Sequence, residues 1–188
     1  QLVRDFGEVE KLQVSVKGPG DYVSLADKRS EEILVNELRR ARPDYSFLTE
    51  ETGVIEGTDT QHRWIIDPLD GTTNFLHGIP MFAISIALER QGQIVAGVIY
   101  NPAMDELYTA ERGGGAFLND RRLRVAGRKT LTDCVIGTGV PHLGRPKHGE
   151  FLVELRNVMS EASGIRKMGS PALDLAYVAA GRFDGFWE

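Results

Sequence analysis

The segment from residue 64 to residue 74 constrains the fold most, because it joins a buried-strand pattern to a run of acidic and turn residues. Its first three residues, 64–66, are apolar and mostly β-branched, which is typical of a buried strand. Pro68 has no backbone N–H and disfavours helical geometry at Asp67, so we expect the strand to end there. Asp70 is a good helix N-cap and predicts a short helix that begins on the small residues after it.

The same segment brings two carboxylates and a helix start into one short turn. Asp67 and Asp70 lie three residues apart and can share a hard cation such as Mg²⁺, to which the Leu69 carbonyl can add an oxygen. The N–H groups of Gly71 and Thr72 lie at the positive end of the expected helix, which suits a phosphate. The alternative is a strand end and a helix cap that bind nothing, and for an isolated Asp-x-x-Asp we would favour it.

The acidic pair Glu50-Glu51 shifts the preference from a turn that binds nothing to a metal site. Residues 46–49 predict a short strand, which Glu50 and Glu51 follow directly. If this strand lies beside the strand that ends at Asp67, Glu50 comes close to Asp67 and Asp70. Three carboxylates without a cationic side chain among them repel one another unless cations or protons intervene. We therefore favour a divalent metal site over a solvated acidic turn.

Asp27 has two interpretations that the sequence leaves open. Ser24 and Asp27 precede a helical pattern with apolar residues at 33, 34 and 38, which is the spacing of a capping box. In that interpretation the Asp27 carboxylate serves the helix start. A role beside a metal ion is no better supported by these residues.

The composition fits one globular domain: 188 residues, of which 41% are hydrophobic, with a net charge of −5. This charge predicts no direct nucleic-acid partner. The single Cys134 excludes an internal disulfide and fits a reducing cytoplasm. We find no secretory signal and no apolar run of membrane length, so we expect a cytoplasmic protein without a membrane partner. Both ends look cut, so we expect 1–188 to be a single catalytic domain truncated at both ends, its C-terminal part missing.

The pattern changes near residue 125 and divides the expected α/β domain into two portions. The portion 1–125 carries the candidate metal and phosphate site, and its later strands form an antiparallel meander. These later strands are expected at 82–88, 94–100, 107–110 and 116–118. The portion 126–188 alternates strands and helices as an incomplete α/β substrate portion. Its expected elements are strands at 135–138, 165–168 and 183–187 and helices at 147–161 and 171–180.

Several segments together resemble the inositol monophosphatase family, and its bacterial inositol-1-monophosphatase branch in particular. They are Glu50-Glu51, the whole segment 64–74, Pro80, Ser85–Leu88 and the later segment Gly169–Arg182. The resemblance implies a layered αβαβα sandwich, shared with fructose-1,6-bisphosphatases. It also implies a Mg²⁺-dependent, Li⁺-sensitive phosphatase with two or three Mg²⁺ ions per site, a small phosphorylated polyol as substrate, and a homodimer.

The resemblance further implies roles for individual residues. Metal would be held by Glu50, Asp67, Asp70 and the Leu69 carbonyl. Phosphate and substrate would contact Leu69, Asp70, Gly71 and Thr72, with the alcohol part against Arg166, Gly169, Ser170 and Glu188. Glu50 and Thr72, together with a metal ion, would orient and deprotonate the attacking water, and Asp27 would hydrogen-bond Thr72.

Two departures and several alternatives accompany this interpretation. The family's second signature, a Trp-Asp pair, is expected a few positions after Glu188 and is absent, and Pro171 stands where relatives usually carry Ala.

Other substrates within the family are histidinol phosphate, NADP, a sugar bisphosphate or a sulfated nucleotide. An aspartyl-phosphate mechanism fits poorly, because the two acids of segment 64–74 are three apart with Pro68 between them. A regulatory protein that binds the transcription machinery is an alternative from a different class.

Overall fold

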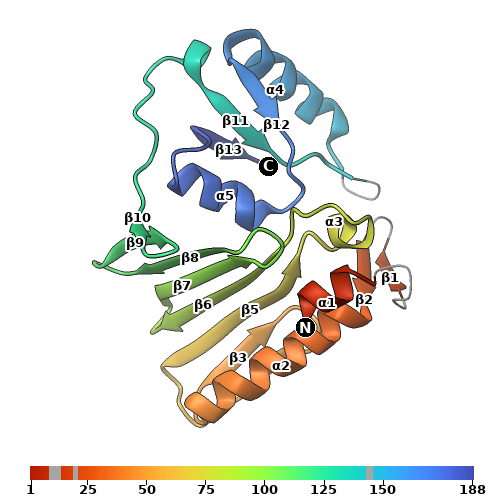
Figure 1. The fold of residues 1–188 in the computed structure, drawn as a ribbon, viewed down its shortest axis with the longest axis vertical. Coiled ribbons are helices and arrows are strands. Elements are labelled where there is room, and N and C mark those ends of the chain that lie inside the picture. Colours follow the sequence, from red (N-terminus) through yellow and green to blue (C-terminus); the bar gives the residue numbers. More distant parts are fainter. Residues whose placement is uncertain (9–13, 19–20, 143–145) are drawn as a thin grey trace.

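The computed structural model describes residues 1–8, 14–18, 21–142 and 146–188. They form five layers in the order helix, sheet, helix, sheet, helix (Figure 1). The helices, from one outer layer to the other, are α1 (Leu2–Phe6) with α2 (Leu25–Ala41), then α5 (Pro171–Ala179), then α4 (His148–Glu161). This arrangement confirms the predicted αβαβα sandwich. Within these described ranges, no helix is both long and apolar enough to cross a membrane.

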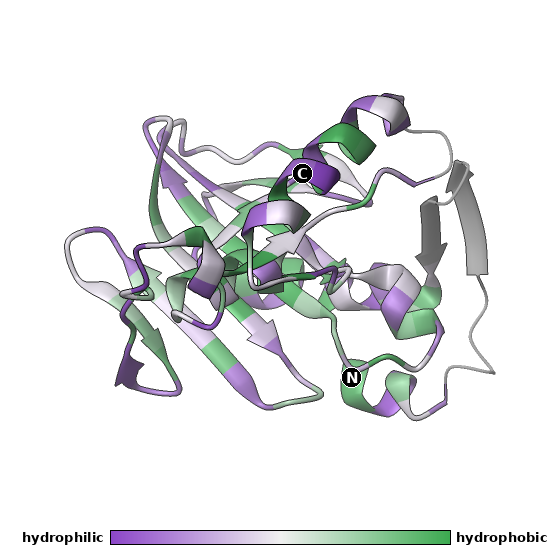
Figure 2. Cartoon of the chain, turned by 90° about the horizontal axis from the view of Figure 1, so that it is seen from above, coloured by the Kyte–Doolittle hydropathy of each residue, from purple (hydrophilic) through white to green (hydrophobic). Residues whose placement is uncertain are grey.

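The large sheet has eight strands in the order β10-β9-β8-β7-β6-β5-β3-β4. Its strands are β3 (Ser46–Thr49), β4 (Gly53–Ile55), β5 (His62–Asp70), β6 (Ala83–Arg90), β7 (Gln93–Asn101), β8 (Glu106–Glu111), β9 (Gly115–Leu118) and β10 (Arg121–Arg122). From β5 to β10 neighbouring strands are antiparallel, as the expected meander requires. Figure 2 shows hydrophobic and hydrophilic residues interspersed along these strands.

Two smaller sheets complete the fold. The strands β1 (Val14–Gly18) and β2 (Asp21–Ser24) form an antiparallel pair before α2. The strands β11 (Val135–Thr138), β12 (Gly164–Arg166) and β13 (Gly185–Trp187) form a parallel sheet in the order β12-β11-β13. This parallel sheet, with α4 and α5, is the α/β portion that the second half of the sequence predicts.

The strand β5 is longer than the sequence predicts. It continues through Pro68 to Asp70, so the expected end at that proline is wrong. Its pairing with β6 is irregular between Asp67 and Asp70 and resumes where Asp70 lies opposite Ala83. A proline is tolerated in a strand at such an irregularity, because no ladder hydrogen bond is required from its nitrogen.

The helix α2 covers one face of the large sheet and begins with the predicted capping box. The Ser24 side chain accepts an N–H of the first turn at 3.1 Å, and the Asp27 carboxylate accepts the Ser24 N–H at 2.8 Å. Such a cap contributes about 1 kcal/mol. Val35 packs against Phe47 and Ile66, which are 1% and 2% exposed, and burial of each of these side chains stabilises the fold by roughly 1.5–3 kcal/mol.

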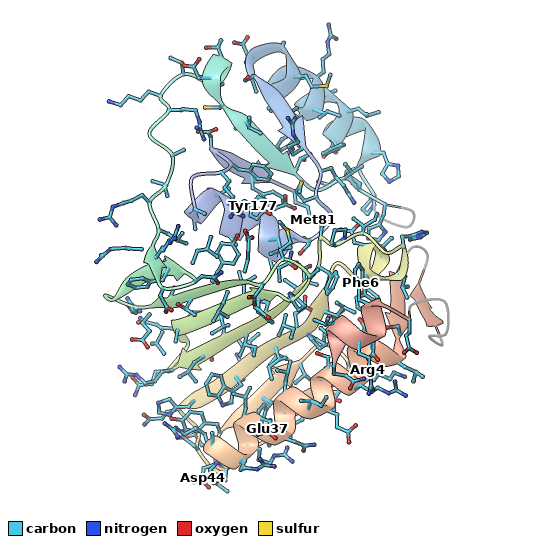
Figure 3. All side chains as sticks on the ribbon, in the orientation of Figure 1. Arg4, Phe6, Glu37, Asp44, Met81 and Tyr177 are labelled. Carbon is cyan, nitrogen blue, oxygen red and sulfur yellow. The ribbon has the colours of Figure 1, made fainter. Side chains whose placement is uncertain are left out.

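The helix α5 lies between the two main sheets. Leu173 is fully buried on its inner face, and Tyr177 and Met81 pack in the same hydrophobic cluster (Figure 3). On the far side of the parallel sheet, the rings of Phe151 in α4 and Trp187 in β13 stack with centroids 6.1 Å apart. The parallel sheet is therefore held between apolar faces of α5 and α4.

Candidate active site

The parallel pairing of β3 and β5 brings the predicted acidic residues to one edge of the large sheet. Thr49, the last residue of β3, lies opposite Ile66 of β5. In this parallel register Glu50, the residue after β3, comes level with Asp67, which lies within β5. This is the neighbourhood that the sequence predicted.

These carboxyl groups are close enough to change one another's protonation. Burial raises the pKa of Asp67 to about 8, and the charges of Asp70 and Glu50 add to this effect. The Leu69 N–H donates a hydrogen bond to the Asp67 carboxylate at 3.0 Å, and this bond lowers the pKa of Asp67. A hydrogen bond with the Glu50 carboxyl raises the Asp67 pKa further, since one proton must lie between the two groups.

The Asp70 carboxylate points toward α5. Its Oδ2 accepts hydrogen bonds from the Ser170 hydroxyl and, at 2.8 Å, from the Ala172 N–H. Burial raises the Asp70 pKa, these two hydrogen bonds lower it, and the Glu50 and Glu188 charges raise it again, for a net increase. Ser170 is itself fully buried. The buried Ser170 hydroxyl thus contacts the candidate metal ligand Asp70.

The donor set fits a hard divalent cation. Glu50, Asp67 and Asp70 are all oxygen donors whose mutual repulsion a cation would relieve, which matches the preference of Mg²⁺. Over the described part of the chain, however, no three acidic, histidine or cysteine side chains already stand as a finished ligand set. A cation at this position would therefore require the three carboxylates to come closer together.

The helix α3 (Thr72–Leu76) begins one residue later than predicted. Its N-cap is Gly71, with φ +89°, and no side chain caps it, so the expected cap at Asp70 is wrong. A Cβ at position 71 would lie 2.9 Å from the Met81 carbonyl oxygen and 3.1 Å from that of Gly169. Both the left-handed backbone and the close approach therefore require glycine.

Thr72 and Asp27 are joined as the resemblance implied. The Thr72 hydroxyl donates to Asp27 Oδ1 at 2.9 Å and also lies 3.0 Å from the Leu69 carbonyl oxygen. Asp27 Oδ2 accepts from the Ser24 hydroxyl at 2.6 Å, so the carboxylate serves the helix cap and Thr72 together. Burial raises the Asp27 pKa, and these hydrogen bonds partly offset that increase.

A cleft of about 570 Å³ opens beside these residues, between the large sheet and the parallel sheet. Gly71 and Thr72 line it from one side, and Gly169 and Glu188 line it from the other. Arg166 does not line it: this side chain is exposed and donates to the neighbouring Ile165 carbonyl at 2.9 Å. Of the four residues predicted to meet the alcohol part, two therefore border the cleft.

Several polar residues of the cleft were not predicted from the sequence, among them Lys167, Asp174 and Asn74. Lys167 lines it where Arg166 does not, and no sequence signal separates these neighbours. Asp174 is 1% exposed, and its Oδ1 has no hydrogen-bond partner. Burial and the Asp70 charge raise the pKa of Asp174 to about 7, although the charge of Lys167 lowers it. An acid within the apolar pattern of 172–178 was a signal for Asp174. Asn74 lines the cleft, and its amide donates to the carbonyls of residues 81 and 168 at 2.7 and 2.8 Å.

The chain belongs to the inositol monophosphatase family, whose family model matches residues 2–188. An inositol-1-monophosphatase of Mesorhizobium japonicum is 77% identical over all of this chain and 70% of its own length. The crystal structure of the extragenic suppressor protein suhB from Bartonella henselae superposes with a TM-score of 0.97 at 70% identity, over all of this chain and 72% of that chain. A Nus factor SuhB of Pseudomonas aeruginosa is 44% identical, over all of this chain and 70% of its length.

Proposed function

We propose that this chain is a Mg²⁺-dependent phosphomonoesterase that hydrolyses an inositol monophosphate to inositol and phosphate. The observation that carries the proposal is the electrostatic coupling of Glu50, Asp67 and Asp70, together with the cleft that Asp70 and Thr72 line. The high identity to a relative named inositol-1-monophosphatase supports the choice of substrate. Histidinol phosphate, NADP and sugar bisphosphates are the competing substrates.

The metal would be held by Glu50, Asp67, Asp70 and the Leu69 carbonyl. When bound, Mg²⁺ supplies positive charge that offsets the charge of the phosphoryl oxygens and acidifies the attacking water. The N–H groups of Gly71 and Thr72 would bind phosphate oxygens.

Thr72 would orient the attacking water. Because its hydroxyl hydrogen is directed to Asp27 or to the Leu69 carbonyl, its oxygen lone pairs are left to accept a hydrogen bond from that water. The exposed Glu50 carboxylate would take the water's proton. The water oxygen would bond to phosphorus as the phosphorus–oxygen ester bond breaks, and the leaving polyol oxygen would take a proton from solvent water. The polyol would then leave along the side lined by Gly169 and Glu188.

Other features of the proposal come from the family alone. We propose inhibition by Li⁺, two or three Mg²⁺ ions per site, a homodimer and a cytoplasmic location on that basis. For Ser170, the contact with Asp70 favours a role in holding a metal ligand over direct contact with the alcohol.

The test is phosphate release from inositol 1-phosphate and the competing substrates, with Mg²⁺ and with EDTA. We expect Mg²⁺-dependent release that is fastest for inositol 1-phosphate and falls to background in Asp70→Asn. The matched control is Asp120→Asn, which changes an exposed carboxylate in the turn between β9 and β10 and should leave the rate unchanged. No release from any of these substrates, or equal release in EDTA, contradicts the proposal.

A second candidate is a regulatory binding role, which the 44% identity to a Nus factor SuhB favours. Complementation with Asp70→Asn separates the two functions. A cellular phenotype restored in full by a variant without phosphatase activity supports the regulatory role.

A further inference from the structure

Glu31 of α2 is a buried carboxylate outside the predicted site residues, and it accepts three hydrogen bonds from one turn. It is only 3% exposed. Its Oε2 accepts the Glu51 N–H at 2.8 Å, and its Oε1 accepts the Thr52 N–H at 3.0 Å and the Thr52 hydroxyl at 2.5 Å. One buried side chain thus holds two consecutive peptide groups of the turn that follows β3.

That turn carries Glu50, the candidate metal ligand. The two peptide groups bound by Glu31 come directly after Glu50 in the chain, so they fix the backbone from which its side chain extends. The turn is closed on its other side by Thr49, whose hydroxyl donates to the Gly53 carbonyl at 3.1 Å. Rotation of the Glu50 backbone therefore requires breaking bonds to α2.

The same face of α2 holds the other half of the site. Asp27, Ser30 and Glu31 are spaced so that they share one side of the helix, and all three are buried. Asp27 accepts from Thr72, and the Ser30 hydroxyl donates to the Pro68 carbonyl at 2.9 Å. One rigid helix of 17 residues therefore contacts the Glu50 turn, the end of β5 and the start of α3.

We propose that Glu31 is a positioning residue: it fixes the turn that carries Glu50 beside Asp67 and Asp70, so that a shared divalent cation can gather the three carboxylates without rearrangement of that turn. This inference rests on the proposed function of the same site. Glu31 acts through the turn: its own oxygens bond to the peptide groups of 51–52. Hydrogen bonds to a carboxylate are stronger than those between neutral groups, which suits a residue that fixes a loop.

The substitution Glu31→Gln tests this, because it keeps the shape of the side chain and replaces one acceptor oxygen by an NH₂ group facing N–H donors. We expect the dissociation constant for Mn²⁺, a spectroscopic probe of the Mg²⁺ site, to rise roughly tenfold, as for the loss of one such hydrogen bond. Half-saturating Mg²⁺ for phosphate release should rise by a similar factor, and the amides of residues 51 and 52 should exchange faster with deuterium.

The control is Glu32→Gln, the same change on the adjacent, exposed residue of α2. It should alter none of the three measurements. If Glu31→Gln does not fold, Thr52→Val removes only the hydroxyl donor and should weaken Mn²⁺ binding in the same direction, by roughly threefold.

Two outcomes overturn the proposal, and they differ in what else they exclude. If the wild-type chain binds Mn²⁺ and the Glu31 or Thr52 variant binds it equally well despite faster exchange at 51–52, Glu31 is merely structural and the proposed function stands. If the wild-type chain binds no Mn²⁺ and releases no phosphate with Mg²⁺, the proposed function fails as well.

Discussion

The substitution Asp67→Asn should stabilise the metal-free protein while it removes metal binding. In the folded chain, burial and the charges of Asp70 and Glu50 raise the Asp67 pKa from 3.8 to about 8. An acid with a raised pKa contributes stability that is fully present below its unfolded value and is lost as the pH rises through its folded value. At neutral and alkaline pH, the metal-free protein therefore has an unfavourable carboxylate at this position.

The size of the effect follows from the interval between the two pKa values. At pH 8 the interval above 3.8 is about four pH units, which at about 1.4 kcal/mol per unit sets an upper bound of about 6 kcal/mol. Asp67 is only partly buried, and solvent screening reduces this. We expect the free energy of unfolding of Asp67→Asn in EDTA to exceed that of the wild type by about 2 kcal/mol at pH 8, and to equal it near pH 4.

The assay is urea denaturation followed by circular dichroism at pH 4 and pH 8, in EDTA and in Mg²⁺. Added Mg²⁺ should stabilise the wild type and leave Asp67→Asn unchanged, because a cation stabilises only the form that binds it. Asp120→Asn serves as the exposed control. The reasoning is refuted if Asp67→Asn is less stable than the wild type at pH 8 in EDTA.

Two further changes test other parts of the site. Gly71→Ala should lower the free energy of unfolding by about 2 kcal/mol or more, because its φ is +89° and the new Cβ would meet the Met81 carbonyl oxygen at 2.9 Å; unchanged urea denaturation would contradict this. Asp174→Asn should flatten the fall in stability between about pH 4 and pH 7, because burial raises the pKa of Asp174 from 3.8 to about 7, so that in this range the carboxyl group is ionised in the unfolded chain and still protonated in the folded one. An equal slope in variant and wild type would exclude this role.

Local sequence signals predicted much of the site's surroundings. The capping box at Ser24 and Asp27 depends on neighbouring residues alone, and the structure contains it. The prediction that Glu50 lies beside Asp67 needed only two strands in parallel register, and both are present. The end of β5 was predicted wrongly at Pro68. The strand continues because Asp70 pairs with Ala83 of β6, and this pairing is not visible in the local sequence.

Side-chain direction at single positions could not be predicted. Arg166 and Lys167 are neighbours of like charge, and only the tertiary placement of β12 decides that Lys167 lines the cleft. The role of Asp27 was open for the same reason, since its contact with Thr72 joins residues 45 positions apart. The role of Glu31 could not be predicted either, because its hydrogen-bond partners, the N–H groups of residues 51 and 52, are distant in the sequence.

The direction of one short strand decides whether Glu50 can lie beside Asp67. Within the ranges that the structure describes, β3 and β5 are the one parallel neighbour pair of the eight-stranded sheet. If β3, with its four residues, ran the other way, Glu50 would leave the opposite edge, about 13 Å distant at 3.3 Å per residue. A reversed connection would thus separate the proposed metal ligands while every acidic residue stayed in the sequence.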